Sequence, residues 1–324
     1  MHTDLAIEIK EMHKLSENDG FSEEEFTTKG ITVSRVKISG DKAAEQLNKK
    51  KGEYITIDLK DAFSDTETHT SAVDVTASEI EKLIYQDGHD GKEKSALVVG
   101  LGNKLLTSDS VGPKAIENLL VTRHIKEHMP ELFKTLNLNS VSALIPGVLG
   151  QTGIETFEIV KSTTEKIKPD VIIVVDALAS RRMNRLCRTI QISNTGICPG
   201  SGVGNKRDEL SQQSLGIPVI SIGIPTVVDA ATLTADTIEL ALEKIKLQLD
   251  ENNAEIIDAF NAFEENDGDE IIRDTLSPFD LNLIVTPKDI DRLMEKCARL
   301  LGLALNKALH GGLEQEEINA LLGL

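Results

Sequence analysis

The sequence predicts an α/β fold in which helices cover both faces of a mostly parallel sheet. Two continuous apolar runs, at residues 96–99 and 171–175, are typical of strands that are buried on both faces. From residue 95 onward, strand-like segments alternate with amphipathic helical patterns, as in chains built from β-α-β units. Apolar residues make up 40% of the 324 residues, which is enough for a substantial core.

Residues 1–94 are predicted to form an N-terminal extension packed on that core. Residues 31–38 and 54–59 alternate apolar and polar side chains, which favours half-buried strands. We therefore expect this segment to form its own small sheet or hairpin. A helix is expected over residues 77–85, with Ser78 as its N-cap.

Residues 95–324 are predicted to form the α/β core, with the whole chain as one domain. After the first buried strand, an amphipathic helix is expected over residues 113–129. Acidic residues at about 250–280 are expected to leave the core as a surface excursion, and C-terminal helices over 284–309 to end the fold. The other expected core elements are strands at 141–145, 189–193 and 218–224 and helices at 154–167 and 232–249.

Composition and charge argue against several classes of partner. The 53 acidic and 35 basic side chains leave a net charge of −18, which repels nucleic-acid phosphates and anionic lipid, so no direct nucleic-acid or membrane partner is expected. No stretch approaches the roughly 20 apolar residues of a membrane span. The three cysteines form no CxxC motif and the N-terminus lacks a secretory signal, so a cytoplasmic protein is expected.

The segment at 95–113, SALVVGLGNKLLTSDSVGP, contains the first candidate functional residues. Gly100 and Gly102 allow a tight turn after the strand, Asn103 follows, and Asp109 lies in a short loop before a helix. Open α/β sheets bind ligands at the carboxyl ends of their parallel strands, so Asp109 is expected at such a site. Backbone groups of residues 100–103 are candidates to hold a substrate chain.

The second buried strand also ends on an acid, Asp176, so we expect the carboxylates of Asp109 and Asp176 to face one cleft. Two close carboxylates do not both ionise easily, so the pKa of one rises and the pair shares a proton. One carboxylate then activates a water as general base, and its protonated partner donates to the substrate carbonyl or the leaving amine. Such chemistry needs no metal, no cofactor and no nucleophilic side chain.

Other interpretations of these motifs stay open. An aspartate after a strand is, taken alone, more often a helix N-cap or a solvated loop residue. A dinucleotide site is disfavoured because Leu105 stands where GxGxxG requires its third glycine. A metal site would have to be all-oxygen, because no histidine lies between His128 and His310. A Ser or Cys triad is disfavoured because GxSxG is absent and neither Cys187 nor Cys198 has a histidine nearby.

Three further features have two interpretations each. The PGSGVGNKR segment, with Gly200, Gly202 and Gly204, is either a surface turn or the backbone wall of a substrate groove. Arg181 either orients the acids or binds an acidic substrate, or it is a solvated charge. Asp229 is either a third acid of the cleft or a helix cap.

Several long motifs resemble those of the germination protease family of spore-forming bacteria. They occur in order over nearly the whole chain: TDLAIE, LVVGLGN, TSDSVGP, LLVTRHI, IPGVLGQTGIET, PDVIIVVDALASR, TIQISNTGICPGSGVGNKR, LGIPVISIGIPTVVDA and LIVTPKDIDRLME. The resemblance implies a three-layer α/β/α sandwich similar to hydrogenase maturation proteases. It also implies an endopeptidase that degrades small acid-soluble spore proteins in the spore core during germination, without a cofactor and as a homotetramer. The two acids proposed for the family fall on Asp109 and Asp176.

The resemblance implies further that the protein is made as a precursor that processes itself near its N-terminus, at a bond between an acid and an aliphatic residue. Only Met1 and His2 precede the TDLA segment here, and the bond from Asp4 to Leu5 is the one expected to be cut. Ser108 stands where the family has proline, a position that acid–base chemistry does not use. Two rivals remain, namely a metal-dependent maturation endopeptidase and a non-enzymatic binding protein with the same fold.

Overall fold

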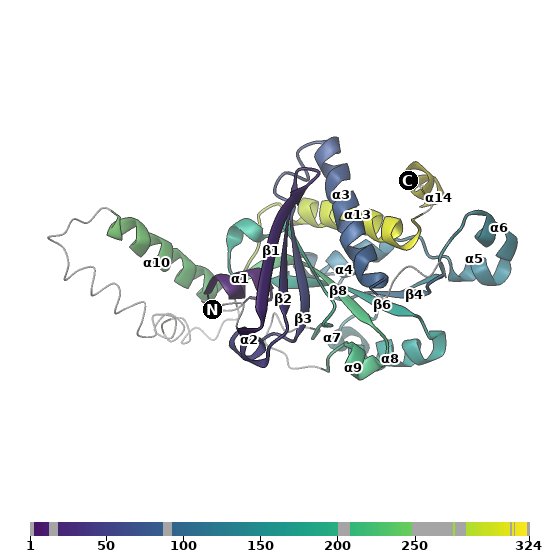
Figure 1. Cartoon of the computed structure of the whole chain (residues 1–324), viewed down its shortest axis with the longest axis horizontal. Helices are drawn as coiled ribbons and strands as arrows, with labels where there is room; N and C mark the ends of the chain where they lie inside the picture. The colour runs from purple at the N-terminus through teal and green to yellow at the C-terminus, as the bar shows by residue number, and fades with distance from the viewer. Residues whose placement is uncertain are drawn as a thin grey trace.

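A computed structural model of the chain describes residues 3–12, 19–86, 93–199, 208–247, 275, 283–311, 313 and 315–322. Within them, one sheet of nine strands has the order β1-β2-β3-β7-β8-β6-β4-β5, and β9 pairs with β8 (Figure 1). The strands are β1 (Phe21–Thr28), β2 (Ile31–Ile38), β3 (Gly52–Asp58), β4 (Ala96–Gly100), β5 (Val141–Leu144), β6 (Val171–Ala179), β7 (Thr189–Ser193), β8 (Val219–Asp229) and β9 (Ile284–Val285). The helices are α1 (Ala6–Met12), α2 (Asp41–Gln46), α3 (Thr66–Ile84), α4 (Val111–Glu117), α5 (Arg123–His128), α6 (Pro130–Thr135), α7 (Leu149–Thr152), α8 (Thr156–Ile167), α9 (Gln212–Leu215), α10 (Ala230–Lys246), α13 (Ile290–Leu309) and α14 (Gln315–Leu322), with short 3-10 turns η2 (Thr107–Asp109) and η3 (Met183–Arg185).

Only part of this sheet is parallel. The ladders that join β5, β4, β6 and β8 are parallel, whereas those from β1 through β2, β3 and β7 to β8 are antiparallel, as is the β8–β9 pair. The expectation of a mostly parallel sheet is therefore wrong, and the sheet is mixed. The physical reason is that an apolar pattern reports the burial of a strand but not its direction or its partner.

The N-terminal strands extend this same sheet. β3 pairs with β7, and Ile57 of β3 lies opposite Ile190 of β7. Both side chains are fully buried in one cluster, so the join is a continuous part of the core. The expectation of a separate small sheet is therefore wrong, whereas β1 and β2 do form an antiparallel hairpin within the large sheet.

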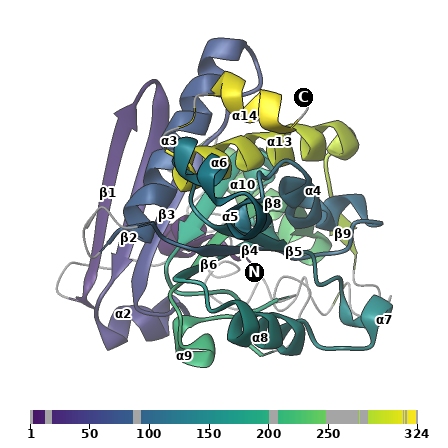
Figure 2. The ribbon, with the colours of Figure 1, turned by 90° about the vertical axis from the view of Figure 1, so that its right-hand side faces the viewer.

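Helices cover both faces of the sheet, as the sequence predicts (Figure 2). On one face, α3, α4 and α13 share an apolar cluster with Ile173 and Val175 of β6. On the other face, Val160 of α8 packs with Ile172 and Val174. Alternate side chains of β6 thus enter two apolar layers, which explains its continuous apolar run.

Helix α3 begins earlier than the sequence pattern suggests. It starts at Thr66 because Asp65, and not Ser78, is its N-cap, whose side chain accepts a hydrogen bond from Thr68 N (2.8 Å). Ser78 instead lies inside the helix. The earlier cap adds about three helical turns, and α3 shares an apolar cluster with β2 and β3.

The single helix expected over residues 113–129 is divided into α4 and α5, with a non-helical segment between them. Asn306 of α13 explains the break, because its Oδ1 accepts from Leu120 N (2.8 Å) and its Nδ2 donates to Asn118 O (2.9 Å). These tertiary bonds replace the backbone bonds of a continuous helix.

Two other expectations concern the outer parts of the chain. Apart from Thr275, the expected acidic excursion at 250–280 lies outside the described residues. Among the helices that the structure describes, none is both long enough and apolar enough to cross a bilayer.

Candidate functional site

Asp109 lies beyond the carboxyl end of β4, as the sequence predicts. The 3-10 turn η2 carries it, and its Oδ2 accepts a hydrogen bond from Asn103 N (2.8 Å). Gly102 has φ +113°, and a Cβ atom on it would lie 2.0 Å from Asp109 O, so only glycine fits beside the acid. Gly100 packs in the same way on Gly112 O. The structure thus gives Gly100, Gly102 and Asn103 a role in shaping the loop that presents Asp109.

Asp176 lies within β6 and not after it, which corrects the expectation of a strand that ends at residue 175. β6 continues to Ala179 because the long strand β8 still provides partners there, with Gly223 opposite Asp176. The Asp176 side chain is buried, and its Oδ1 accepts from Ala177 N (2.9 Å). The acid is therefore held on a rigid strand.

The structure brings Asp109 and Asp176 into one cavity of about 210 Å³. Burial raises the pKa of Asp176 well above its usual value, and the negative charge of Asp109 raises it further. The like-charge effect expected from the sequence is present, but desolvation is the larger cause. The cavity is lined by Leu101, Gly102, Leu106, Ser108, Asp109, Gly147, Val148, Thr156, Asp176, Ala177, Leu178, Ala179, Pro199, Thr226, Val227 and Ile284.

The N-terminal segment lies against β6 directly beyond Asp176. Asp4 N donates to Ala179 O (2.9 Å), and Ala179 N donates to Asp4 Oδ2 (2.8 Å). Leu5 is fully buried in a small cluster with Leu178. The charge of Asp4 is a further cause of the raised pKa of Asp176. The expected processing bond is thus held against the end of β6, beyond Asp176, by contacts between residues about 175 apart in sequence.

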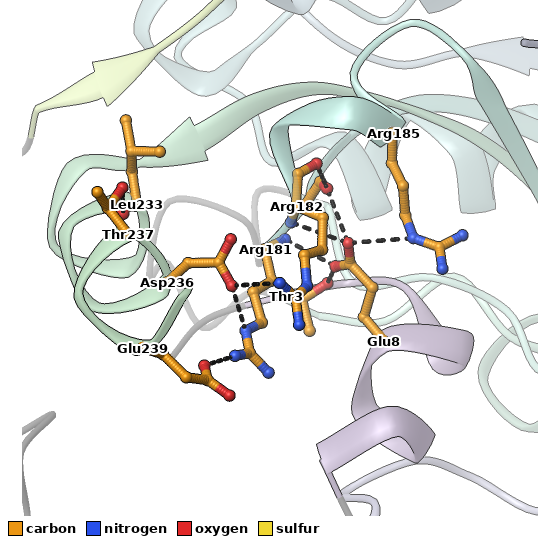
Figure 3. A network of polar contacts seen from close by, with 10 residues as sticks. Thr3, Glu8, Arg181, Arg182, Arg185, Leu233, Asp236, Thr237 and Glu239 are labelled. Atoms are coloured by element: carbon orange, nitrogen blue, oxygen red, sulfur yellow. Dashed lines mark hydrogen bonds and ion pairs between the residues drawn. The ribbon is translucent and has the colours of Figure 1, made fainter. Parts of the chain in front are cut away.

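Arg181 lies outside the cavity, in a buried polar network (Figure 3). Its side chain pairs with Asp236 (Nε to Oδ1, 3.2 Å) and with Glu239, both on α10. Its backbone N donates to the carboxylate of Glu8 (2.7 Å), which is fully buried and also accepts from Arg182 N (2.9 Å). Arg181 thus helps to tie α1 and α10 to the loop after β6, and its partner Glu8 was not predictable from any local pattern.

The remaining site expectations have separate outcomes. Asp229 is the N-cap of α10 and accepts from Thr232 N (2.9 Å), so the helix-cap interpretation is confirmed. Gly200, Gly202 and Gly204 lie outside the described residues. In the described part of the chain, His, Cys, Asp and Glu side chains do not gather in groups of three or more suited to a metal ion.

Gln191 is a residue of this region that the sequence analysis missed. It is buried on β7, and its side chain contacts the backbone of Asp4 and of Ala6. The pattern TIQIS carried no clear signal, because it alternates polar and apolar residues as in a strand whose polar face meets solvent, whereas all five residues of β7 are buried. A polar side chain in a fully buried strand must find a partner, and here the partner is the N-terminal segment.

Comparison with known proteins agrees with the resemblance seen in the motifs. A family model described as germination protease matches residues 2–258 and 244–321. A germination protease of Caldanaerobacter subterraneus is 43% identical over 325 residues, covering 99% of this chain and 98% of the relative. Germination proteases of Clostridium perfringens (43% identical, 99% of both chains) and Bacillus mycoides (38% identical, 99% of this chain and 96% of the relative) are similar along almost their full lengths. Because the family model and these relatives span almost the entire sequence, this chain belongs to the germination protease family.

Proposed function

We propose that this protein is an aspartic-type endopeptidase that hydrolyses small acid-soluble spore proteins in the spore core during germination. The observation that carries the proposal is the shared cavity of Asp109 and Asp176, in which the pKa of Asp176 is raised. A carboxyl group that keeps its proton beside an ionised carboxylate is the arrangement that acid–base hydrolysis requires. The family of the chain supports a peptidase.

Each acid takes a distinct role in this mechanism. Asp176 holds the proton, because burial and the neighbouring charge favour its neutral form. Asp109 acts as the base, and the hydrogen bond from Asn103 N stabilises its carboxylate. Asp109 takes a proton from water as the water oxygen bonds to the carbonyl carbon. The C–N bond then breaks, the Asp176 proton passes to the leaving nitrogen, and proton exchange between the acids restores the starting state.

Processing at the bond from Asp4 to Leu5 belongs to the same proposal. The position of this bond beside β6 supports it, because Leu5 packs on Leu178, two residues after Asp176 on the same strand. The homotetramer remains a proposal, as does a substrate-holding role for the backbone of residues 100–103 and of the glycine-rich loop at 200–204.

The test incubates the chain with a small acid-soluble spore protein and follows cutting, and its own processing, by mass spectrometry. We expect the wild type to cut the spore protein and its own N-terminal segment, with and without a chelator. Asp109→Asn and Asp176→Asn each remove a proton-transfer group, so their rates should fall by at least about 100-fold. Loss of activity with chelator would favour the metal-dependent endopeptidase, and two fully active variants would refute the acid pair.

A further inference from the structure

Two side chains bind the carbonyl oxygen of Asp4, the carbonyl of the expected processing bond. Lys49 Nζ donates to this oxygen at 2.9 Å, and Gln191 Nε2 donates to it at 3.0 Å. Gln191 also accepts a hydrogen bond from Ala6 N through its Oε1 (2.6 Å). The amide of Gln191 therefore spans Leu5 and fixes the backbone on both sides of it.

Gln191 and Asp176 point to the same face of the sheet. Gln191 lies opposite Gly223 in the antiparallel β7–β8 ladder, and Gly223 lies opposite Asp176 in the parallel β8–β6 ladder. Residues paired in this way share a face, so the two side chains stand two strand spacings apart, about 10 Å. The residue between them is glycine, which leaves that space to Leu178, the side chain on which Leu5 packs.

Lys49 differs from the lysines beside it. Lys50 pairs with Glu209 and Lys51 with Asp41 at the surface, whereas Lys49 turns inward to Asp4. Burial lowers the pKa of Lys49, and the Asp4 carboxylate opposes this shift. A half-buried cation is costly unless it has polar partners, and the partners of Lys49 are the carbonyl oxygen and the carboxylate of Asp4.

We propose that Gln191 and Lys49 hold the carbonyl group of the peptide bond that this peptidase cuts. Gln191 fixes the backbone before reaction, and Lys49 stabilises the oxygen as attack of water on the carbonyl carbon gives it negative charge. When the C–N bond breaks, the carbonyl re-forms and the charge is lost. The inference deepens the proposed function and rests on it.

The same two side chains then receive the spore-protein substrate. Processing releases residues 1–4, so the positions around Asp4 open to the acidic residue that precedes the bond in a second polypeptide. An open groove of about 970 Å³, which includes Asp4, Lys49 and Gln191 in its lining, gives that polypeptide room to enter.

Substitutions of Gln191 and of Lys49 should have different kinetic effects on cleavage of a small acid-soluble spore protein. Gln191→Ala removes contacts that exist with the uncut chain, so KM should rise about tenfold while kcat changes little. Lys49→Ala removes a contact that strengthens in the transition state, so kcat should fall by about 100-fold. Lys49→Arg keeps the charge and should recover part of this loss.

Matched controls separate these effects from loss of folding. Thr189→Ala changes a buried polar residue on the same strand as Gln191, and Lys42→Ala removes a surface lysine that pairs with Asp19. Both controls should cut at wild-type rates, and the Tm of every variant is recorded. Wild-type kcat and KM in both Gln191→Ala and Lys49→Ala would refute the inference and leave the proposed function intact. A lowered Tm with unchanged kinetics would also refute it, since the contacts would then only anchor the segment. If the wild-type chain cuts neither itself nor the spore protein, the proposed function fails first.

Discussion

The raised pKa of Asp176 predicts how the stability of the protein depends on pH. Asp176 is buried, and its pKa in the folded protein lies well above the value of about 3.9 expected for an unfolded chain. Well below pH 4 both states are protonated, so the carboxyl costs no stability. As the pH rises above 4, the unfolded chain releases this proton first, and the folded state loses stability until the pH passes its own pKa.

The substitution Asp176→Asn removes this titration while it keeps the shape of the side chain. The amide oxygen of asparagine can still accept the hydrogen bond from Ala177 N. Between the unfolded and the folded pKa of Asp176, the free energy of unfolding of the variant should therefore rise relative to the wild type by about 1.4 kcal/mol for each pH unit. Above the folded pKa the difference becomes constant, and the pH at which this happens measures the pKa.

Urea unfolding of both proteins at half-unit steps from pH 4 to pH 9 tests this prediction. Asp65→Asn is a control that should stay nearly flat across this range, because hydrogen bonds from Thr68 lower the pKa of Asp65 and its contribution is lost only as the pH falls below about 4. A difference between wild type and Asp176→Asn that stays flat across this range would falsify the raised pKa, and with it the assignment of Asp176 as the proton carrier.

Two further substitutions test the surroundings of the site. Glu8→Ala leaves buried N–H groups of the loop at Arg181 without an acceptor, so the free energy of unfolding should fall by about 3 kcal/mol or more, measured by urea unfolding; a loss below 1 kcal/mol would contradict the network. Gly223→Ala places a Cβ 2.4 Å from the side chain of Leu178, so stability should fall by about 1–3 kcal/mol and self-processing should slow, as followed by mass spectrometry. Gly150→Ala, where a Cβ would meet nothing within 4 Å, is the matched control and should stay within about 0.5 kcal/mol of the wild type; equal effects of the two alanines would contradict the close packing over β8.

Local patterns in the sequence were sufficient for a large part of the fold and of the site. The buried strands β4 and β6 were predictable because a strand covered on both faces must be apolar at every position. The shared cavity of Asp109 and Asp176 was predictable because each acid follows or interrupts such a run. The motifs around them also indicated the family correctly.

Tertiary structure alone decided which strands pair and which distant residues contact the N-terminal segment. Apolar periodicity encodes burial, and it carries no information on strand direction, so the antiparallel join of β3 to β7 was not predictable. The contacts of Asp4 with Lys49, Ala179 and Gln191 bridge about 45, 175 and 187 residues. Such contacts depend on how the whole sheet and its loops pack, because no local propensity links residues so far apart. The sequence by itself therefore determined the acids and the strands that carry them, and the packed fold determined what surrounds the bond they are proposed to cut.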